Sequence, residues 1–455
     1  MRKKAGDKAA GGTLCKTGYF RMLVTAVGEH TSLAKIIKLV EEAASGKAPI
    51  ARLADRISGV FVPVVIAIAL CSAAVWLFAG QEPEFALGVG ISVLVISCPC
   101  ALGLATPTAI MAGTGKGAQR GILVKSAEAL ESLQGARVVV LDKTGTLTEG
   151  KPRVTDLIPN GVSENELLLY AASLEKLSGH PLAGTIVEKA EEAGIVLKEA
   201  AGFRPLPGYG ISAAIDGIEV YGGNRKLMDG YGIACEIMGG REKELSENGK
   251  TVLYFARGGR LIGLIAAADT IKPTSAAAVR ELYRMGLEVI MLSGDNSLTA
   301  EAIGRQAGLQ RVVAGVLPAD KENEIRALQA KGKKVVMVGD GVNDAPALAR
   351  ADVGIAIGAG TDIAIESADI VLTRSDLNDV ADAIKLSKAV MRNIRQNLFW
   401  AFIYNIIGIP VAAGVFYLPF GWLLNPMIAA AAMSFSSVSV VTNALRLNLF
   451  RPGRS

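Results

Sequence analysis

This chain of 455 residues has little from which to build a disulfide scaffold, and its charges nearly balance. Its 5 cysteines form no even set of spaced pairs, which excludes a small domain held together by disulfide bonds. A net charge of +5 is small and gives no case for nucleic acid as a partner. The most informative absence is that of charge itself, because several long stretches contain no Asp, Glu, Lys or Arg.

These uncharged stretches have the length of membrane-spanning helices. Such a helix needs about 20 mainly apolar residues, and a hydrophobic content of 51% is high for a soluble protein. A buried core helix can look the same, but four such runs in one chain favour an integral membrane protein. The expected spans are residues 60–79, 85–113, 398–418 and 423–444.

The basic residues indicate how these spans are oriented. Short loops that stay in the cytoplasm are enriched in Lys and Arg. The connections at residues 80–84 and 419–422 contain neither, whereas Lys and Arg flank the opposite ends of the runs. We therefore expect residues 116–395 and both termini to be cytoplasmic, in a multi-pass protein of the lipid bilayer of the cell membrane.

Cys98, Pro99 and Cys100 lie inside the second run. Residues two apart on a regular helix point about 200° away from each other, so both thiols cannot meet one ion there. Pro99 lacks an N–H and clashes with the preceding turn, which opens the helix and lets both thiolates face one soft monovalent cation. This segment predicts an intramembrane metal site. The alternative is a proline kink with two small apolar side chains packed against their neighbours.

Three short apolar runs in the cytoplasmic region each end in a polar motif. Helical-looking segments at 274–285 and 323–331 separate them, which predicts buried parallel strands of a doubly wound α/β sheet. Ligands bind outside the carboxyl ends of such strands, so the three motifs should converge. The runs are residues 137–141 before Asp142, 287–292 before Ser293, and 335–338 before Gly339 and Asp340.

Their convergence would supply the groups that phosphoryl transfer needs. Asp142 would be the nucleophile and, together with Asp340, would hold Mg²⁺. Ser293 and Lys321 would neutralise the transferred phosphoryl oxygens. A single Asp after a strand is usually a helix cap or a turn residue, but that explanation would have to hold at three strand ends at once.

A region of roughly 120 residues before Asp269 is long enough to form a separate domain. It contains Glu175, His180, Gly208 and Gly210. Taken alone these are weak indications, because a single His is more often a capping or packed residue and Gly-x-Gly is common in turns.

Together these motifs resemble those of the heavy-metal P-type ATPases, specifically their copper(I) subgroup. The resemblance is carried by Asp-Lys-Thr-Gly-Thr at 142–146, Gly-Asp-Gly-x-Asn-Asp at 339–344 and Cys-Pro-Cys at 98–100. It implies a phosphorylation domain of the haloacid dehalogenase type, an inserted nucleotide-binding domain and membrane helices. It also implies that ATP phosphorylates Asp142 and that the aspartyl phosphate is hydrolysed as ion sites open alternately to the two sides.

The resemblance assigns roles to further residues. It implies that Lys143 and Thr144 are catalytic residues, and that Thr144 is also a magnesium ligand. The family usually has Ser-Glu-His-Pro where this chain has Gly179 before His180, and Thr where it has Ser293, which keeps the hydroxyl. Residues implied to support the phosphorylation site are Asp295, Asn343 and Asp344, and those implied to hold the adenosine part of ATP are Glu175, His180, Gly208 and Gly210.

The last two apolar runs bear on the choice of ion. A thioether beside two thiolates suits copper(I), with silver(I) as a mimic. Zinc or cadmium pumps, the alternative, need a buried charge to balance a divalent ion, and no Asp, Glu or Lys occurs between residues 398 and 445. The implied ligands are Cys98, Cys100, Tyr404, Asn405, Met433 and Ser437, although Tyr404 and Met433 are equally compatible with ordinary helix packing.

The beginning of the chain departs from the family. Residues 3–7 resemble the stretch after the Thr-Gly-Glu loop of the actuator domain, and no Thr-Gly-Glu occurs here. We therefore expect the C-terminal part of a longer pump, supplied by a soluble copper chaperone, that binds ATP without completing transport alone. Its expected parts are an actuator remnant (1–45), a membrane helix pair (46–117), a phosphorylation domain (118–149 and 269–390), a nucleotide-binding domain (150–268) and a second membrane pair (391–455).

Two other interpretations remain open. A soluble phosphatase of the same aspartate-nucleophile fold would leave the apolar runs unexplained. A copper-binding membrane protein without enzymatic activity would not become phosphorylated. Asp55, at the cytoplasmic mouth of the first span, would mark where ions enter, or would only cap or solvate the helix.

Overall fold

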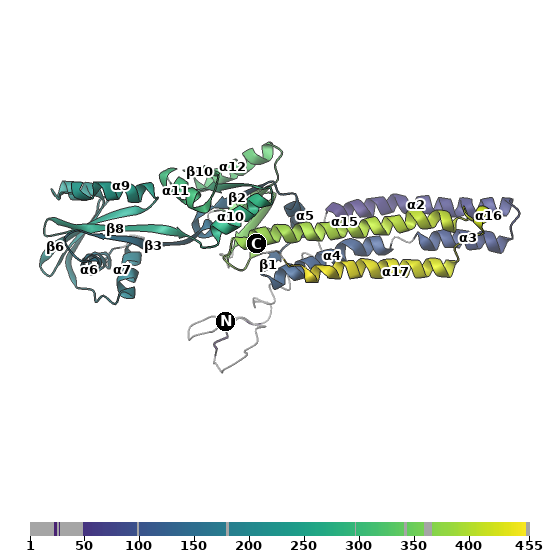
Figure 1. Ribbon diagram of the computed structural model, residues 1–455, viewed down its shortest axis with the longest axis horizontal. Coiled ribbons are helices and arrows are strands. Elements are labelled where there is room, and N and C mark those ends of the chain that lie inside the picture. The colour runs from purple at the N-terminus through teal and green to yellow at the C-terminus, as the bar shows by residue number, and fades with distance from the viewer. Residues whose placement is uncertain are drawn as a thin grey trace.

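The computed structural model describes residues 22–24, 27, 49–97, 100–178, 182–295, 297–340, 344–358 and 366–451. The rest of the expected actuator remnant at 1–45 lies outside these residues, as do Cys98, His180, Asn343 and the side chain of Cys100. The molecule is elongated, with a helical bundle at one end, an α/β domain in the middle and an antiparallel sheet at the other end (Figure 1).

The middle domain is built on a seven-stranded sheet of order β1-β13-β12-β11-β2-β9-β10. Its neighbouring strands are parallel, except that β1 is antiparallel to β13. This confirms the expected doubly wound sheet. The strands are β1 (Ile122–Val124), β2 (Val138–Asp142), β9 (Glu288–Leu292), β10 (Arg311–Val313), β11 (Val335–Gly339), β12 (Val353–Ile357) and β13 (Ile370–Leu372).

Helices cover both faces of this sheet, as its continuous apolar strands require. On β2, Val139 and Leu141 share an apolar cluster with α5, α10 and α11, whereas Val138 and Val140 share one with α12 and α13. The expected helix at 323–331 begins earlier, at Pro318, because proline is favoured in a first helical turn. These helices are α5 (Ala127–Gln134), α10 (Ser275–Arg284), α11 (Ser297–Ala307), α12 (Pro318–Ala330) and α13 (Ala345–Arg350).

The second sheet has six antiparallel strands in the order β3-β8-β7-β6-β5-β4. Its long strands β3 (Thr148–Pro159) and β8 (Arg260–Ile271) run out of the middle domain side by side (Figure 1). The sheet falls mostly in the region expected to be inserted, 150–268, but β3 begins before it at Thr148 and β8 ends after it at Ile271. Its other elements are β4 (Ala200–Leu206), β5 (Gly210–Ile215), β6 (Ile218–Gly223), β7 (Thr251–Arg257), α6 (Glu164–Glu175), α7 (Ala183–Glu192), α8 (Arg225–Gly230), η3 (Glu236–Met238) and α9 (Gly239–Glu247).

The bundle contains all four apolar runs, with one correction to their expected bounds. The helix break that Pro99 predicts in the run at 85–113 is confirmed, because α3 ends at Ile96 and α4 begins at Cys100. The run at 398–418 belongs to a helix that ends at Ala412, shortly before Gly414 adopts a φ of 80°. The bundle elements are α2 (Pro49–Phe78), α3 (Pro83–Ile96), α4 (Cys100–Gln119), α15 (Asn378–Ala412), α16 (Tyr417–Phe420), α17 (Pro426–Leu445) and η4 (Arg446–Leu449).

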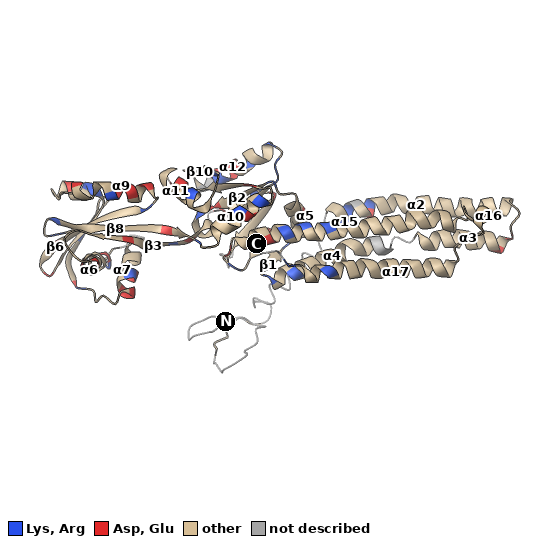
Figure 2. Cartoon of the chain, viewed as in Figure 1, with Lys and Arg blue, Asp and Glu red and all other residues tan. Residues whose placement is uncertain are grey.

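By length and composition, the helices at Pro49–Phe78 and Pro426–Leu449 are the two in the described part of the chain that could cross a membrane. Lys and Arg gather at the end of the bundle next to the middle domain, and the remaining length of the bundle is nearly free of charge (Figure 2). This distribution agrees with the expected cytoplasmic side.

Candidate active site and ion site

Asp142 is the last residue of β2, which lies between β9 and β11 in the sheet. It pairs in register with Leu292, and Leu141 pairs with Val338. Ser293 and Asp340 directly follow these partner strands. The structure therefore brings the three strand-end motifs together, because the carboxyl ends of parallel neighbours meet at one edge.

The chain leaves Asp142 through a tight loop, η2 (Lys143–Leu147), which needs a glycine. Gly145 has a φ of 72°, a conformation that is unfavourable for residues with a Cβ. A Cβ at this position would also lie 2.7 Å from Asp340 Oδ2. The bare backbone of Gly145 thus lets the loop lie directly against the Asp340 carboxylate.

Lys321, in the first turn of α12, joins the two acidic motifs. Its Nζ donates hydrogen bonds to Asp142 Oδ1 at 2.5 Å and to Asp344 Oδ1 at 2.6 Å. Burial alone would lower the pKa of Lys321, but the charges of Asp142 and Asp344 outweigh it and raise that pKa. Lys321 therefore stays protonated between two carboxylates, where it can stabilise negative charge that develops on a phosphoryl group.

The carboxyl groups of this cluster have pKa values above the ordinary value for Asp. Burial, together with the negative charge of Asp344, raises the pKa of Asp142 to about 6, although Lys321 opposes the shift. Burial and the charge of Asp142 raise the pKa of Asp340, and burial raises that of Asp344. Additional positive charge would stabilise all three in their ionised forms.

These residues fit a magnesium ion. Asp344 is only 1% exposed, and its Oδ2 has no hydrogen-bond partner among the residues that the structure describes. Within the described ranges, no group of three or more His, Cys, Asp or Glu side chains has the geometry of a complete metal site. Mg²⁺ is usually held by one or two carboxylates, with water and substrate phosphates completing its shell, so Asp142 and Asp340 are sufficient, and the Thr144 carbonyl is a further candidate ligand.

Lys143 and Ser293 flank Asp142 on its other side. Lys143 Nζ lies 2.7 Å from Asp295 Oδ2, in a half-buried ion pair. Ser293 is buried, and its Oγ accepts a hydrogen bond of 3.1 Å from the Asp295 backbone N–H, so its own hydroxyl proton is free to point elsewhere. Asp295 thus positions both predicted catalytic side chains.

Sequence reasoning missed two residues at the return from the inserted sheet. Asp269 accepts hydrogen bonds from Thr148 Oγ1 at 2.5 Å and from the Gly150 N–H at 2.9 Å. The buried Lys272 donates to the Gly145 carbonyl, and to Ser375 Oγ at 2.8 Å. The available signal was a single Asp and a single Lys near the end of the apolar strand β8, with a proline directly after the Lys.

In the inserted sheet, Glu175 ends α6 and is buried. Burial raises its pKa, although Ser178 donates a hydrogen bond to it, and Oε2 has no partner. Gly210 approaches β6 so closely that a Cβ would lie 2.1 Å from the Gly222 carbonyl oxygen. A Cβ on Gly222 would in turn lie 3.0 Å from Leu174, next to Glu175, so the glycine loop and the carboxylate belong to neighbouring surfaces.

Gly208 has a φ of 78°, and its carbonyl accepts a hydrogen bond of 2.9 Å from Asn224 Nδ2. No atom lies within 4 Å of the position of its missing Cβ, so this side of the turn is open. The open turn at Gly208 and the free Oε2 of Glu175 are both features that can contact a flat ring that carries an N–H donor.

The predicted ion ligands differ in how far they face the interior of the bundle. Asn405 on α15 is 5% exposed, and its Oδ1 accepts no hydrogen bond among the described residues. Met433 on α17 packs in one apolar cluster with Ile96 at the end of α3. Tyr404 is 44% exposed and Ser437 is half-buried, so Asn405 is the most deeply buried of these four residues.

Two further residues of the bundle complete this picture. One turn after Asn405, a Cβ on Gly408 would lie 2.6 Å from Ile96 Cγ1, so α15 is in close contact with the end of α3. Thr106 on α4 is buried and its Oγ1 has no partner, which sequence reasoning missed. Asp55 is exposed on α2.

Comparison with known proteins gives consistent matches. A family model described as haloacid dehalogenase-like hydrolase matches residues 136–352. The chain is 51% identical over 454 residues to the probable copper-transporting ATPase PacS of Synechococcus elongatus, covering 99% of this chain and 61% of that protein. It is 49% identical over 457 residues to the silver exporting P-type ATPase of Salmonella typhimurium, covering 100% of this chain and 56% of that protein.

A solved structure also matches over most of the chain. This is a zinc-transporting PIB-type ATPase in its E2.Pi state, which is 38% identical, with a TM-score of 0.78, and is matched over 93% of this chain and 68% of its own length. The chain thus spans little more than half the length of the curated relatives it matches and about two thirds of this solved structure.

Proposed function

Because the chain belongs to the heavy-metal P-type ATPase family, in its copper-transporting subgroup, we propose that it is the catalytic and ion-conducting part of an ATP-driven copper(I) exporter. The observation that carries the proposal is the arrangement at Asp142. A buried carboxylate at the end of a central parallel strand shares one lysine with Asp344 and lies beside Ser293 and Asp340. A carboxylate so placed is suited to accept a phosphoryl group.

In the proposed reaction, a carboxylate oxygen of Asp142 attacks the γ-phosphorus of ATP. The bond from that phosphorus to the β–γ bridging oxygen breaks, and ADP leaves with the electron pair. Lys321 and the Ser293 hydroxyl neutralise the equatorial oxygens during transfer, while the Lys143–Asp295 pair keeps the loop after Asp142 in place. A water molecule later attacks the phosphorus and releases phosphate, which restores the carboxylate.

The magnesium ion would be held by Asp142, Asp340 and Thr144, and would supply positive charge to the transferred phosphoryl oxygens. Burial, and then the charge of a neighbouring carboxylate, raise the pKa values of Asp142 and Asp340, and a bound cation would oppose both effects. Asp344 and Asn343 would support this shell.

The nucleotide would bind to the inserted sheet. The unpaired, buried Oε2 of Glu175 supports a role as acceptor for the adenine amino group, and the open turn at Gly208 and Gly210 would lie against the ring. His180 is proposed as the fourth contact on the strength of its motif.

The transported copper(I) ion would bind where α3 and α4 are interrupted. Cys98 and Cys100 would supply thiolates, and Met433 a thioether, which are the ligands that a soft monovalent ion prefers. The buried Oδ1 of Asn405, which has no hydrogen-bond partner among the described residues, supports a polar contact to the ion, and Tyr404 and Ser437 complete the proposed set. A zinc or cadmium pump is the second candidate, supported by the likeness to the zinc-transporting structure.

The chain would cross the lipid bilayer of the cell membrane four times, with the basic end of the bundle on the cytoplasmic side (Figure 2). The expected spans are α2, α3 continued by α4, the second half of α15, and α17. A soluble copper chaperone is the proposed donor of the ion.

The test is metal-dependent phosphorylation of the 455-residue chain in lipid vesicles, using radiolabelled ATP. Acid-stable label should appear on the wild type with copper(I) or silver(I), and should disappear in Asp142→Asn. Asp156→Asn, on the surface of the inserted sheet, is the matched control and should retain the label.

Each other outcome refutes a part of the proposal. Label on Asp142→Asn would show that Asp142 is not the nucleophile. Stimulation by zinc(II) but not copper(I) would show that the transported ion is zinc(II). Phosphatase activity that is indifferent to metal would favour the soluble-type hydrolase instead.

A further inference from the structure

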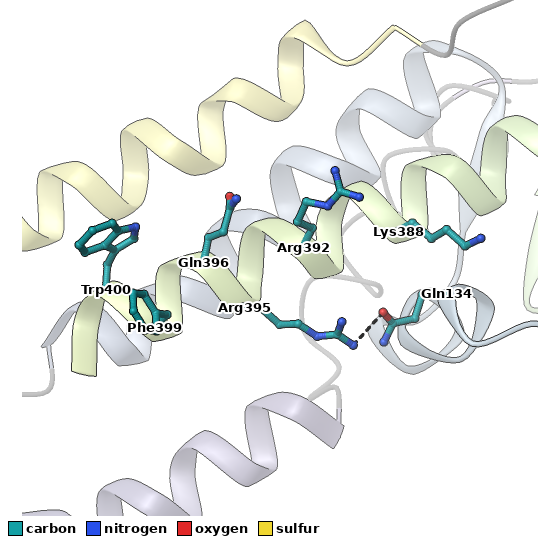
Figure 3. Close-up of a pocket in the computed structure, with 7 residues that line it drawn as sticks. All are labelled: Gln134, Lys388, Arg392, Arg395, Gln396, Phe399 and Trp400. Atoms are coloured by element: carbon teal, nitrogen blue, oxygen red, sulfur yellow. Dashed lines mark hydrogen bonds between the residues drawn. The ribbon is translucent and has the colours of Figure 1, made fainter. Parts of the chain in front are cut away.

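A pocket of ≈530 Å³ lies at the junction between the bundle and the middle domain (Figure 3). It is outside the phosphorylation, nucleotide and ion sites described above. Its lining comes from one face of α15 and from the end of α5. The lining residues that matter here are Gln134, Lys388, Arg392, Arg395, Phe399 and Trp400.

The charge of this pocket is of one sign. Lys388, Arg392 and Arg395 are spaced so that they share one side of α15, and the lining contains no carboxylate. Arg395 Nη2 donates a hydrogen bond of 3.0 Å to the neutral Gln134 Oε1. In the part of the chain that the structure describes, none of the three cations pairs with an acidic side chain.

The aromatic residues follow the cations along the same helix. Phe399 and Trp400 begin one turn after Arg395, and are 58% and 56% exposed. Next come Ile406 and Ile407, which are 61% and 62% exposed. The outer side of α15 therefore changes from cationic to aromatic to aliphatic in the direction that leads away from the middle domain.

This order matches the layers of a membrane surface. Lipid phosphates lie outermost, aromatic rings prefer the level of the headgroups and esters, and aliphatic side chains face the acyl chains. Along α15, Lys and Arg lie at the end of the bundle next to the middle domain (Figure 2). We propose that the pocket binds the headgroup of one anionic phospholipid of the cytoplasmic leaflet, with Arg392 and Arg395 on the phosphate and Trp400 beside the glycerol.

A general basic band also attracts anionic lipid, so the test must separate the pocket from the band. Each Lys or Arg close to an anionic surface strengthens binding by roughly fivefold. Arg56 on α2 and Arg446 in η4 are exposed at the same end of the bundle, but do not line the pocket. Their replacement removes the same number of charges from the band.

The experiment uses the fluorescence of Trp400 in the 455-residue chain, with Trp76 and Trp422 replaced by Phe. The chain is placed in vesicles of phosphatidylcholine that contain either brominated phosphatidylglycerol or brominated phosphatidylcholine, at equal mole fractions. Quenching by each lipid gives their relative binding beside Trp400. The measurement needs neither ATP nor copper, so its failure would leave the proposed pump activity untouched.

The expected result is a preference for phosphatidylglycerol of at least about threefold. In Arg392→Gln/Arg395→Gln the preference should fall to about one, and in Arg56→Gln/Arg446→Gln it should stay. Equal quenching by both lipids in the wild type overturns the proposal, as does an equal loss in both double variants.

A further arm adds soluble glycerol phosphate to the phosphatidylglycerol vesicles. Binding of a lipid with its acyl chains predicts that millimolar glycerol phosphate leaves the quenching unchanged. Loss of the quenching on addition of glycerol phosphate would show that the pocket binds a free phosphate ester, and would overturn the proposal of a bound lipid. The circular dichroism of both double variants checks that the helices are retained.

Discussion

Lys321 Nζ lies 2.5 Å from Asp142 Oδ1, so the cation of α12 is in direct contact with the carboxylate at the end of β2. The same ammonium lies 2.6 Å from Asp344 Oδ1. One positive charge is thus shared between two buried carboxylates. Its removal changes both the charge that meets a phosphoryl group and the acidity of the nucleophile.

Lys321→Met should slow phosphorylation in a pH-dependent way. Lys321 lowers the pKa of Asp142 against the effect of burial, so its loss moves that pKa further above about 6. The initial rate of labelling from ATP at neutral pH should fall about 10²- to 10³-fold, and the midpoint of its pH profile should rise. Lys331→Met, exposed at the end of the same helix, should leave both quantities unchanged. An unshifted midpoint in Lys321→Met would contradict the assigned contact.

Asp142→Asn should stabilise the folded chain at neutral pH. The pKa of Asp142 is raised from 3.8 to about 6 in the fold, so the folded state binds more protons than the unfolded state between these values. The free energy of unfolding therefore falls as the pH rises through this window, and Asn avoids that loss. Thermal unfolding should occur at a higher temperature in Asp142→Asn than in the wild type at pH 7, with the difference shrinking towards about pH 5.

Asp156→Asn should have the opposite effect on thermal stability to that of Asp142→Asn. Burial alone would raise the pKa of Asp156, but hydrogen bonds from Lys250 and Thr155 outweigh it and lower that pKa. Ionised Asp156 therefore stabilises the fold at pH 7, and its replacement should lower the unfolding temperature. Equal shifts in both variants would mean that the two carboxylates do not differ as described.

Glu175→Ala should weaken the binding of ATP. Its buried Oε2 has no hydrogen-bond partner among the residues that the structure describes, and a hydrogen bond from a ligand to a charged acceptor stabilises the complex enough that its loss should raise Kd about tenfold or more. Calorimetric titration with a non-hydrolysable ATP analogue measures this. Glu164→Ala, exposed at the start of the same helix, is the control and should bind as the wild type does. Unchanged affinity in Glu175→Ala would remove this residue from the nucleotide site.

Gly408→Val should disturb the ion site without affecting nucleotide binding. A Cβ at Gly408 would meet Ile96 Cγ1 at 2.6 Å, so α15 must move away from the end of α3. Copper(I)-stimulated labelling should fall at least about tenfold, because the ligands no longer meet in one geometry. At Gly88 no atom lies within 4 Å of a Cβ, so Gly88→Val tests the substitution itself. Equal losses in both variants would show that the contact with Ile96 is not special.

The catalytic edge of the sheet was predictable because its signals are local. The apolar runs before Asp142, Ser293 and Asp340 form β2, β9 and β11. Because the carboxyl ends of neighbouring parallel strands meet at one edge of a sheet, the motifs that follow these strands lie close together. Lys321 was predicted to belong to the site, but it was not predicted to lie in a helix. The apolar pattern indicated a helix only from residue 323, whereas α12 begins at Pro318.

What could not be predicted depends on contacts between distant segments. Lys272, just after the last residue of β8, bonds to the Gly145 carbonyl and to Ser375, which lie 127 and 103 residues away in the sequence, and no periodicity of the sequence encodes these contacts. In the bundle, Pro99 predicted the interruption between α3 and α4, but hydrophobicity alone gave no indication that the helix of the run at 398–418 would end at Ala412.

One helix joins the two halves of this molecule. α15 runs without interruption from Asn378 to Ala412, and Lys272 is bonded to Ser375, just before it begins. About 27 residues separate the start of this helix from Asn405, a distance of roughly 40 Å at 1.5 Å per residue. A tilt of about 5° at its base therefore displaces the amide of Asn405 by roughly 3 to 4 Å, which is more than the length of a metal–sulfur bond. Because α15 is this long, a small rearrangement around Gly145 that tilts the helix is enough to open or close the proposed metal site in the bundle.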